Sequence, residues 1–468
     1  MGNGICSISN LKKTYYYLRK NGLKNAYYAA LERIMREKDG DRRYTFACPL
    51  EETLQRQRQE SRRFPYTFSI LVPAYETDPV YLREMIDSVL GQSYEKLELI
   101  LADAGQTDGV NTVVRSYADP RIRYVKLKEN KGISDNTNAA LAQAQGDYIG
   151  LLDHDDVLTP DALYAMAKAI EENERNGNTA WMLYSDEDKG NGELTEYYEP
   201  HFKPDLNVDL LLSNNYICHF LVMKKDLMKE LGFRREYDGA QDYDLVLRAV
   251  GRLLYGQEKQ SPVIHIPSVL YHWRCHSGST AENPESKRYA YEAGRRALED
   301  FLKARGWRGT VADSLHLGFY MIHYEPDILS VRSEVGAVCG RILDGKGRLA
   351  GGFYQADGSF PYMGISRRFS GYMHRAALAQ EVSAPDLRTV RVRKELQPLF
   401  EEVFGFPYRE TETNGKKKKA DLRRFDWEYS PAQTEDREKQ KQRCLEFGRR
   451  VRQAGYLVVW QPEENVWM

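Results

Sequence analysis

A short apolar run that ends in carboxylates constrains the fold of this chain more than any other stretch. Residues 148–152 are continuously apolar, and residues 153–156 follow directly with the sequence Asp-His-Asp-Asp. A run this short and this apolar is typical of a parallel strand buried on both faces. Thr159 and Pro160 then carry the signals of a helix start, as N-cap and first helical residue. We therefore expect the carboxylates at the carboxyl end of a strand, where open α/β sheets bind their ligands.

Two of these carboxylates, Asp153 and Asp155, can converge on one divalent cation. Mg²⁺ and Mn²⁺ prefer oxygen ligands and combine protein carboxylates with substrate phosphates. The alternative is a polar loop with an acidic cluster ahead of a helix, because carboxylates also stabilise helix N-termini. Asp156 fits that structural role as well as it fits a site.

Composition excludes several classes of function. With 67 Lys and Arg against 68 Asp and Glu, the chain has no net field that would attract nucleic acid. Its 468 residues suffice for two or three domains. The sequence shows no apolar stretch of about 20 residues that could span a bilayer and no apolar core of a signal peptide. Its six cysteines have no metal-type spacing, which is typical of a reducing cytoplasm. We therefore expect a cytoplasmic protein without a nucleic-acid partner.

Strand and helix patterns alternate from residue 68 onward. The sequence predicts strands at 68–72, 97–102, 122–127 and 148–152, with helices at 82–90, 111–117 and 134–144 between them. This alternation predicts an α/β fold with a doubly wound, mostly parallel sheet. Pro-Ala-Tyr-Glu at 73–76 stands where a dinucleotide fold would carry Gly-x-Gly-x-x-Gly, which argues against that fold. A bound diphosphate would instead be held through a cation on Asp153 and Asp155.

The chain is expected to comprise three segments: a basic, helical segment at 1–65, the α/β domain at 66–308 and a C-terminal domain at 309–468. Between residues 11 and 38 the first segment has apolar residues at helical spacing among many Lys and Arg. Such a segment can lie on an anionic membrane surface or pack on the main domain. Residues 277–285, rich in Ser, Gly and Asn, are expected to form a mobile loop over the site.

The motifs between 68 and 274 resemble those of the family 2 glycosyltransferases, which have a GT-A fold. They are Val72-Pro-Ala-Tyr75, Ser88-Val-Leu-Gly-Gln-Ser-Tyr94, Asp103-Ala-Gly-Gln-Thr-Asp108, Gly132-Ile-Ser-Asp-Asn-Thr-Asn138, Gly146-Asp147 and Asp153-His-Asp-Asp156. The chain is also similar to a subgroup of bacterial cell-surface polysaccharide enzymes of the rhamnan or O-antigen type. That similarity rests on Tyr184-Ser-Asp-Glu-Asp-Lys189, Phe202-Lys-Pro204, Gln241-Asp-Tyr-Asp244 and Tyr271-His-Trp-Arg274.

The resemblance implies a role for each of several residues. Asp242, at the start of an expected helix, would be the catalytic base, with Asp244 as its rival. The metal ligands for Mn²⁺ or Mg²⁺ would be Asp153, Asp155 and His272. The nucleotide-sugar would contact Pro73, Tyr75, Glu76, Asp103, Lys131, Gly132, Asn138, Asp153, His154 and Arg274. The acceptor side would include Gln241 and, after an expected strand at 180–184, Asp186 and Glu187. For His272 and Arg274 the alternative is a hydrogen-bonded structural role.

Two positions depart from the family pattern. Ala104 stands where a second aspartate commonly follows the second strand, so one usual contact to the nucleotide base is in doubt. Thr137 stands where an arginine often lies, which leaves the identity of the nucleotide open.

The C-terminal third resembles a degenerate second transferase domain. Residues 335–344 are similar to the middle of such a domain, and 444–462 echo 244–267 as a closing helix and strand. The alternative is an unrelated helical and sheet appendage, and neither case predicts a second active site. The lysines at 416–419 are expected to lie in a solvated loop, with a membrane contact as the alternative.

The sequence thus predicts a metal-dependent inverting glycosyltransferase for cell-surface polysaccharide synthesis. By resemblance, its donor would be a UDP- or dTDP-linked sugar and its acceptor a lipid-linked saccharide, reached at the inner face of the cell membrane. A nucleotidyltransferase is one alternative. A non-catalytic carbohydrate-binding or scaffold protein of the same fold is another, supported by Ala104 and Thr137.

Overall fold

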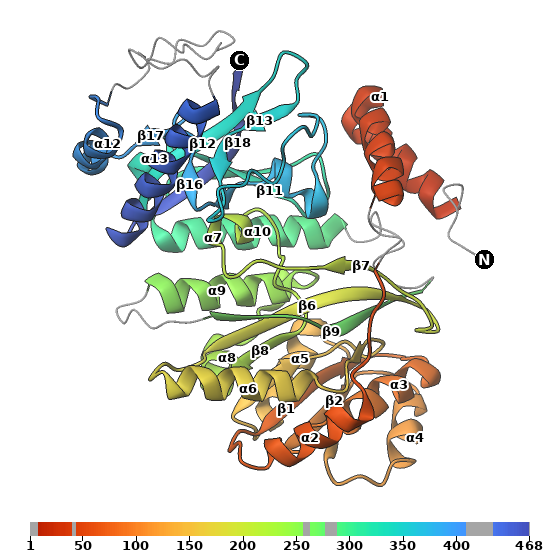
Figure 1. The fold of residues 1–468 in the computed structure, drawn as a ribbon. Coiled ribbons are helices and arrows are strands. Elements are labelled where there is room, and N and C mark those ends of the chain that lie inside the picture. The colour runs from red at the N-terminus through yellow and green to blue at the C-terminus, as the bar shows by residue number, and fades with distance from the viewer. Residues whose placement is uncertain (1–7, 40–43, 256–262, 277–287, 409–433, 468) are drawn as a thin grey trace. The chain divides into compact units, whose positions relative to one another are not determined.

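The computed structural model describes residues 8–39, 44–255, 263–276, 288–408 and 434–467 (Figure 1). The chain divides into two compact units, and each is described by itself. Unit 1 comprises residues 1–17, 33–206 and 215–301, and unit 2 comprises 18–32, 207–214 and 302–468. The loops predicted at 277–285 and 416–419 lie outside the described residues. Within the described residues, no helix is long and apolar enough to cross a membrane.

Unit 1 is built on a nine-stranded sheet with the order β3-β2-β1-β4-β8-β6-β9-β5, and β7 pairs with β6. Strands β1 to β4 form one parallel block, and β6 runs parallel to β9 over the longest register. Strand β8 is antiparallel to both β4 and β6 and so joins the two blocks. The strands are β1 (Phe68–Ala74), β2 (Leu97–Asp103), β3 (Ile122–Lys126), β4 (Tyr148–Leu151), β5 (Val157–Leu158), β6 (Met182–Asn191), β7 (Tyr197–His201), β8 (Leu221–Lys224) and β9 (Val263–Cys275).

The helices of unit 1 form where the sequence places an apolar stripe between strands. In α3 (Pro79–Leu90), Asp78 accepts a hydrogen bond from the Val80 N–H, and Pro79 occupies the first turn. Its buried side chains recur at helical spacing, and each contributes about 1.5–3 kcal/mol by leaving water. They are Leu82, Met85, Ile86 and Val89. The other helices are α2 (Glu51–Ser61), α4 (Gly109–Arg115), α5 (Ile133–Gln143), α6 (Ala162–Arg175), α8 (Lys225–Leu231), α9 (Gln241–Tyr255) and α10 (Arg288–Arg305), whose last residues belong to unit 2.

The predicted α/β class with a mostly parallel sheet is confirmed, and the first four strands lie within two residues of their predicted bounds. The predicted helix start at Thr159 and Pro160 is wrong. The Thr159 N–H bonds to the Leu270 carbonyl, which extends the pairing of β5 with β9. Helix α6 therefore begins only at Ala162, with Asp161 at its N-cap.

The predicted end of the strand at residue 184 is also wrong. Strand β6 continues to Asn191, so Asp186, Glu187 and Asp188 lie within the strand and not after it. The reason is tertiary pairing, because β9 provides hydrogen-bonding partners along this whole length and β7 covers the other edge.

Unit 2 contains a separate five-stranded sheet with the order β13-β12-β18-β15, and β17 pairs with β12. Its central strands, β12 (Val335–Leu343) and β18 (Leu457–Trp467), run parallel. The helix and strand predicted near 444–462 are present as α13 (Thr434–Gln453) and β18. The remaining elements are α7 (Val208–Leu211), β10 (Gly309–Asp313), β11 (Tyr320–Tyr324), α11 (Ile328–Val331), β13 (Leu349–Gly351), β14 (Phe353–Tyr354), β15 (Gln380–Glu381), β16 (Ala384–Pro385), β17 (Arg391–Val392) and α12 (Gln397–Phe404).

The predicted N-terminal helix is present as α1 (Ile8–Asp39), with non-helical backbone at Gly22. Its residues 18–32 belong to unit 2, where the Glu32 carboxylate accepts hydrogen bonds from the Ser370 and Gly371 N–H groups. This part of α1 is therefore tied into a folded unit by a buried carboxylate.

Candidate functional site

Three side chains at the carboxyl end of β4 and the start of β8 form a candidate metal site. One ligand atom from each of Asp153, Asp156 and His219 lies within 4.8 Å of the others. The two aspartates follow β4, as the sequence predicts, while His219 comes from the loop that leads into β8. The His219 ring stacks on Tyr271 of β9, with centroids 4.4 Å apart, which fixes the ring beside the carboxylates.

Burial raises the pKa of both aspartates. For Asp153, the His219 charge opposes this shift and the neighbouring Asp155 adds to it. For Asp156, the charges of Asp153 and Asp155 add to the effect of burial. Two carboxylates, Asp156 buried and Asp153 half-buried, with an imidazole beside them, match the ligands that a divalent cation prefers. The residues present therefore fit Mn²⁺ or Mg²⁺.

Asp156 is not a helix N-terminal carboxylate, because α6 begins only at Ala162. The Tyr271 hydroxyl donates to its Oδ2 over 2.5 Å, and the Arg274 N–H donates to its Oδ1 over 2.7 Å. These bonds to β9 fix the loop after β4 against the neighbouring part of the sheet.

Asp155 lies beside this cluster, and its carboxylate is close to two histidine side chains. Its Oδ2 is 2.9 Å from Nε2 of His276, and its Oδ1 is 3.7 Å from Nδ1 of His154. Asp155 and His154, both predicted site residues, are thus half-buried next to Asp153.

The predicted base, Asp242, lies in the first turn of α9, as expected. Its Oδ2 accepts a hydrogen bond from Asn215 Nδ2 at 2.7 Å and one from the Cys218 thiol at 3.3 Å. The Asp242 charge is also one of the smaller causes of the raised pKa of Asp153.

The two neighbours of Asp242 in its motif have structural partners. The rival Asp244 is buried and forms ion pairs with Arg234 and, at 2.8 Å, with Arg248. The Gln241 Oε1 accepts a hydrogen bond from the Gly239 N–H at 2.8 Å, which closes the turn before α9. Of the three polar residues in this motif, Asp242 is the one that, within the described residues, bonds to the loop carrying His219.

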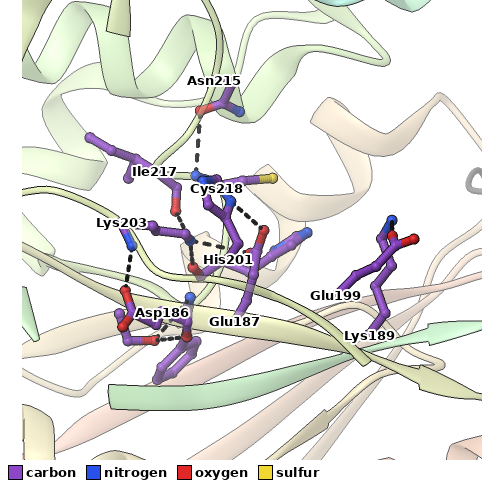
Figure 2. Close-up of polar contacts among 12 residues, drawn as sticks. Asp186, Glu187, Lys189, Glu199, His201, Lys203, Asn215, Ile217 and Cys218 are labelled. Carbon is purple, nitrogen blue, oxygen red and sulfur yellow. Dashed lines mark hydrogen bonds and ion pairs between the residues drawn. The ribbon is translucent and has the colours of Figure 1, made fainter. Parts of the chain in front are cut away.

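Two acids of β6, Asp186 and Glu187, each contact a nitrogen of Lys203 (Figure 2). Asp186 Oδ1 accepts the Lys203 N–H at 2.8 Å and lies 2.9 Å from His265 Nε2. Glu187 Oε2 lies 3.2 Å from Lys203 Nζ. Burial alone would raise the pKa of Glu187, but the charges of Lys203 and His201 lower it well below its ordinary value. Glu187, which is half-buried, is therefore held in its charged form.

His272 and Arg274 on β9 are buried and make contacts that stabilise the sheet. Nδ1 of His272 lies 2.5 Å from Oδ1 of Asp188 on β6. The Arg274 guanidinium donates to the Asp155 and Gly192 carbonyls and pairs with Glu84 at 2.7 Å. In the structure His272 thus pairs with Asp188. Arg274 bonds to the backbone of the loop after β4. The metal-binding and diphosphate-binding roles predicted for them remain predictions.

The loops after β1 and β2 form a second polar region. Asp103 is fully buried and accepts hydrogen bonds from the Gly105 N–H, the Tyr124 hydroxyl and Lys126 Nζ. Glu76 accepts the N–H groups of Gln106 and Thr107, which lowers its pKa together with the Thr107 hydroxyl bond. The predicted residues Pro73 and Tyr75 lie at this edge, Pro73 in β1 and Tyr75 exposed after it.

The residues predicted around α5 differ in their surroundings. Lys131 is exposed and pairs with Glu129 at 3.1 Å. Gly132 has a φ of 103°, and a Cβ there would lie 2.1 Å from Asp238 Oδ2, so only glycine fits. Both ends of the Asn138 amide bond to the Phe233 backbone. Asn138 therefore joins α5 to the segment after α8.

Sequence reasoning missed His219, Cys218, Tyr271 and Lys203 as parts of this region. His219 and Cys218 carry no periodic or spacing signal, and they reach the aspartates only through the pairing of β4, β8 and β6. Tyr271 and Lys203 lie inside the motifs 271–274 and 202–204, which could have drawn attention to them.

The comparison with known proteins concerns the region that contains this site. The family described as glycosyl transferase family 2 matches residues 69–232, which include Asp153, Asp156 and His219. An uncharacterized protein, y4gI, of Sinorhizobium fredii is 47% identical over 238 residues, which are 50% of this chain and 25% of that protein. The O-antigen biosynthesis protein RfbC of Myxococcus xanthus is 34% identical over 242 residues, or 51% of this chain and 18% of that protein.

The chain thus spans a quarter or less of the length of these two relatives. A solved structure of S. aureus TarS 1-349 in complex with UDP-GlcNAc is 18% identical, with a TM-score of 0.40, over 50% of this chain and 66% of that one.

Proposed function

We propose that the chain transfers a sugar from a nucleotide-sugar to a hydroxyl of a saccharide acceptor, because residues 69–232 match the family described as glycosyl transferase family 2. The observation that carries the proposal is the meeting of two groups at one sheet edge. Asp153, Asp156 and His219 fit a cation for a diphosphate, and Asp242 accepts a hydrogen bond from Cys218, the residue before His219. A transferase needs both groups, whereas a protein that only binds saccharides needs neither.

The proposed reaction is a single displacement that inverts the anomeric centre. The acceptor oxygen forms a bond to the anomeric carbon while the bond from that carbon to the diphosphate breaks. The acceptor proton passes to Asp242, which acts as general base. The hydrogen bonds from Asn215 and Cys218 hold this carboxylate in place at the start of α9.

In this proposal Asp153, Asp156 and His219 would hold Mn²⁺ or Mg²⁺, with Asp155 at their side. When bound, the cation would neutralise charge on the departing diphosphate. The Tyr271 hydroxyl and the Arg274 N–H orient Asp156, so the carboxylates are fixed before a donor binds. Asp103, Glu76 and the loop at Gly132 are the proposed contacts for the nucleotide.

The substrates are proposed by class. We propose a UDP- or dTDP-linked donor and a lipid-linked saccharide acceptor, used in cell-surface polysaccharide synthesis at the inner face of the cell membrane. The O-antigen biosynthesis protein among the relatives supports a polysaccharide product. The rhamnan or O-antigen subgroup is proposed on the same ground.

A transfer assay tests this proposal. Purified protein would be incubated with Mn²⁺, with each of several nucleotide-sugars and with a membrane extract as acceptor source, and nucleoside diphosphate release would be measured. We expect release with one nucleotide-sugar that depends on both metal and acceptor. NMR of the product linkage would then report the anomeric configuration. Release of a nucleoside monophosphate with pyrophosphate would favour a nucleotidyltransferase, and no release with any donor would favour a scaffold role.

A further inference from the structure

Lys203, between β7 and α7, carries a buried positive charge next to the proposed site. Its side chain is fully shielded from solvent, although lysine is almost never buried without a partner. We infer that Lys203 is a positioning residue for Asp242 and acts by fixing the backbone of residues 215–219, which we term the base loop. The inference rests on the proposed function, because it concerns the same carboxylate.

The ammonium group of Lys203 has three N–H donors, and three acceptors surround it (Figure 2). It donates to the Ile217 carbonyl at 2.8 Å and to the His219 carbonyl, and it lies 3.2 Å from Glu187 Oε2. The backbone N–H of Lys203 also bonds to Asp186 at 2.8 Å. Lys203 is therefore bonded to β6 through its backbone and to the base loop through its side chain.

The two carbonyls that Lys203 holds are those on either side of Cys218. Cys218 has a φ of 24°, a backbone conformation that costs a non-glycine residue free energy unless its surroundings enforce it. The paired hydrogen bonds from Lys203 supply that constraint. The Asn215 side chain adds a third, because its Oδ1 accepts the Cys218 N–H at 3.4 Å.

The side chains of the base loop point to both halves of the site. Asn215 and Cys218 donate to Oδ2 of Asp242, and His219 faces Asp153 and Asp156. Both base-loop donors bond to Oδ2, so Oδ1 is the Asp242 oxygen that the base loop leaves to accept the proton of an acceptor hydroxyl. The position of the loop backbone thus decides which carboxylate oxygen meets the acceptor.

Glu187 balances the buried charge of Lys203, and so a fair test must remove both charges together. Lys203→Met alone would leave the Glu187 carboxylate without its lysine partner and could fail to fold for that reason. The double variant Lys203→Met/Glu187→Gln removes both charges and the two bonds to the loop carbonyls. Lys189→Met/Glu199→Gln is the matched control, because it removes a lysine and its glutamate partner from β6 and β7, and within the described residues Lys189 Nζ bonds to Glu199 and not to the base loop.

The experiment combines steady-state kinetics with labelling of Cys218. For Lys203→Met/Glu187→Gln we expect kcat to fall about 10-fold or more, with the donor KM within about two-fold of wild type. Iodoacetamide should label the Cys218 peptide about five-fold faster, as read by mass spectrometry, because the thiol loses its packed environment. The control should leave both readouts at wild-type values. Wild-type kcat and wild-type labelling in the double variant would overturn the inference.

A second variant decides the matter if the double variant does not fold. Asn215→Ala removes one donor to Asp242 from the base loop and leaves Lys203 and Glu187 intact. We expect a lower kcat at unchanged donor KM, and an unchanged kcat would overturn the inference. A wild-type protein without transfer activity would instead overturn the proposed function, while Cys218 labelling would still report whether Lys203 holds the loop.

Discussion

Two pairs of parallel strands, β6 with β9 in unit 1 and β12 with β18 in unit 2, share a topology but not a chemistry. In each pair a helix leads into the second strand, α9 before β9 and α13 before β18. Each register contains irregularities partway along its length. This shared order supports the predicted internal repeat, which stays a prediction.

The side chains of the two pairs differ. In unit 1 the pair carries ionisable residues that contact one another across the strands, including Asp186, Asp188, His265 and His272. In unit 2 the matching strands bury apolar side chains, among them Val335, Ala337, Val338, Val458, Val459 and Trp460. Within the described residues, the cluster with metal-ligand geometry lies in unit 1. The comparison shows that two strand pairs of the same topology can differ in chemistry, because the chemistry depends on the side chains that the strands carry.

The largest effect should come from the proposed base. Asp242→Asn should lower kcat by about 10²–10⁴-fold, the usual contribution of a general base. Nucleotide binding and Tm should stay close to wild type. Asp344→Asn is the control, because Asp344 follows β12 in the second pair and its Oδ1 accepts N–H groups that an amide oxygen can also accept. If both variants kept wild-type kcat, the chemical difference between the two pairs would have no functional meaning.

The rival carboxylate should affect stability instead of turnover. Asp244 is buried between Arg234 and Arg248, and removing one partner of a buried ion pair costs about 3–5 kcal/mol. Asp244→Asn should therefore lower Tm markedly in calorimetry, while kcat per folded molecule stays within about two-fold of wild type. A kcat loss as large as that of Asp242→Asn would move the base assignment to Asp244.

In unit 2 the half-buried carboxylate of Glu381 should make stability depend on pH. Burial and the nearby Asp209 raise the pKa of Glu381 from 4.5 to about 7, against the opposing charge of Arg332. Between these values the folded chain holds a proton that the unfolded chain has released, so stability falls as pH rises from 4.5 to about 7. Glu381→Gln should reduce this fall in stability. Each kcal/mol of stability that no longer depends on pH should appear as a difference of about 2–4 °C in Tm. An unchanged pH profile of Tm would contradict this prediction.

The smallest effects should come from one cysteine in each unit. Cys218→Ala removes a weak donor to Asp242, which should lower kcat about five-fold, or about 1 kcal/mol. Cys339→Ala empties a fully buried position on β12, which should lower Tm by a few degrees (about 1 kcal/mol) with kcat unchanged. Kinetics and thermal unfolding of both variants separate the two outcomes. An equal kcat loss in both would mean that the cysteines act through stability alone.

The sequence predicted the strands of the first half and the start of α9 well, because those signals are local. A continuous apolar run predicts a buried strand wherever it lies, and Asp242 follows a turn-forming glycine. The extent of β6 could not be predicted, since its polar residues continue as a strand only because β9 pairs with them.

The cluster of Asp153, Asp156 and His219 shows the same limit. His219 meets the aspartates through the antiparallel insertion of β8 between β4 and β6, and no pattern within one segment encodes that neighbour relation. Lys203 was hidden for a similar reason, because its three acceptors come from β6 and from the base loop.

The most direct test of the account is a thermal shift of the purified protein with UDP, dTDP, GDP and CMP, each with and without Mn²⁺. A ligand that binds only the folded state raises the free energy of unfolding, by about 2.7 kcal/mol at a ligand concentration a hundred times its Kd, and Tm rises with it. We predict a shift for one nucleotide that requires Mn²⁺, is lost in Asp153→Asn and persists in Asp344→Asn. No shift with any nucleotide, or a shift that persists in Asp153→Asn, would contradict a metal-dependent donor site at the end of β4.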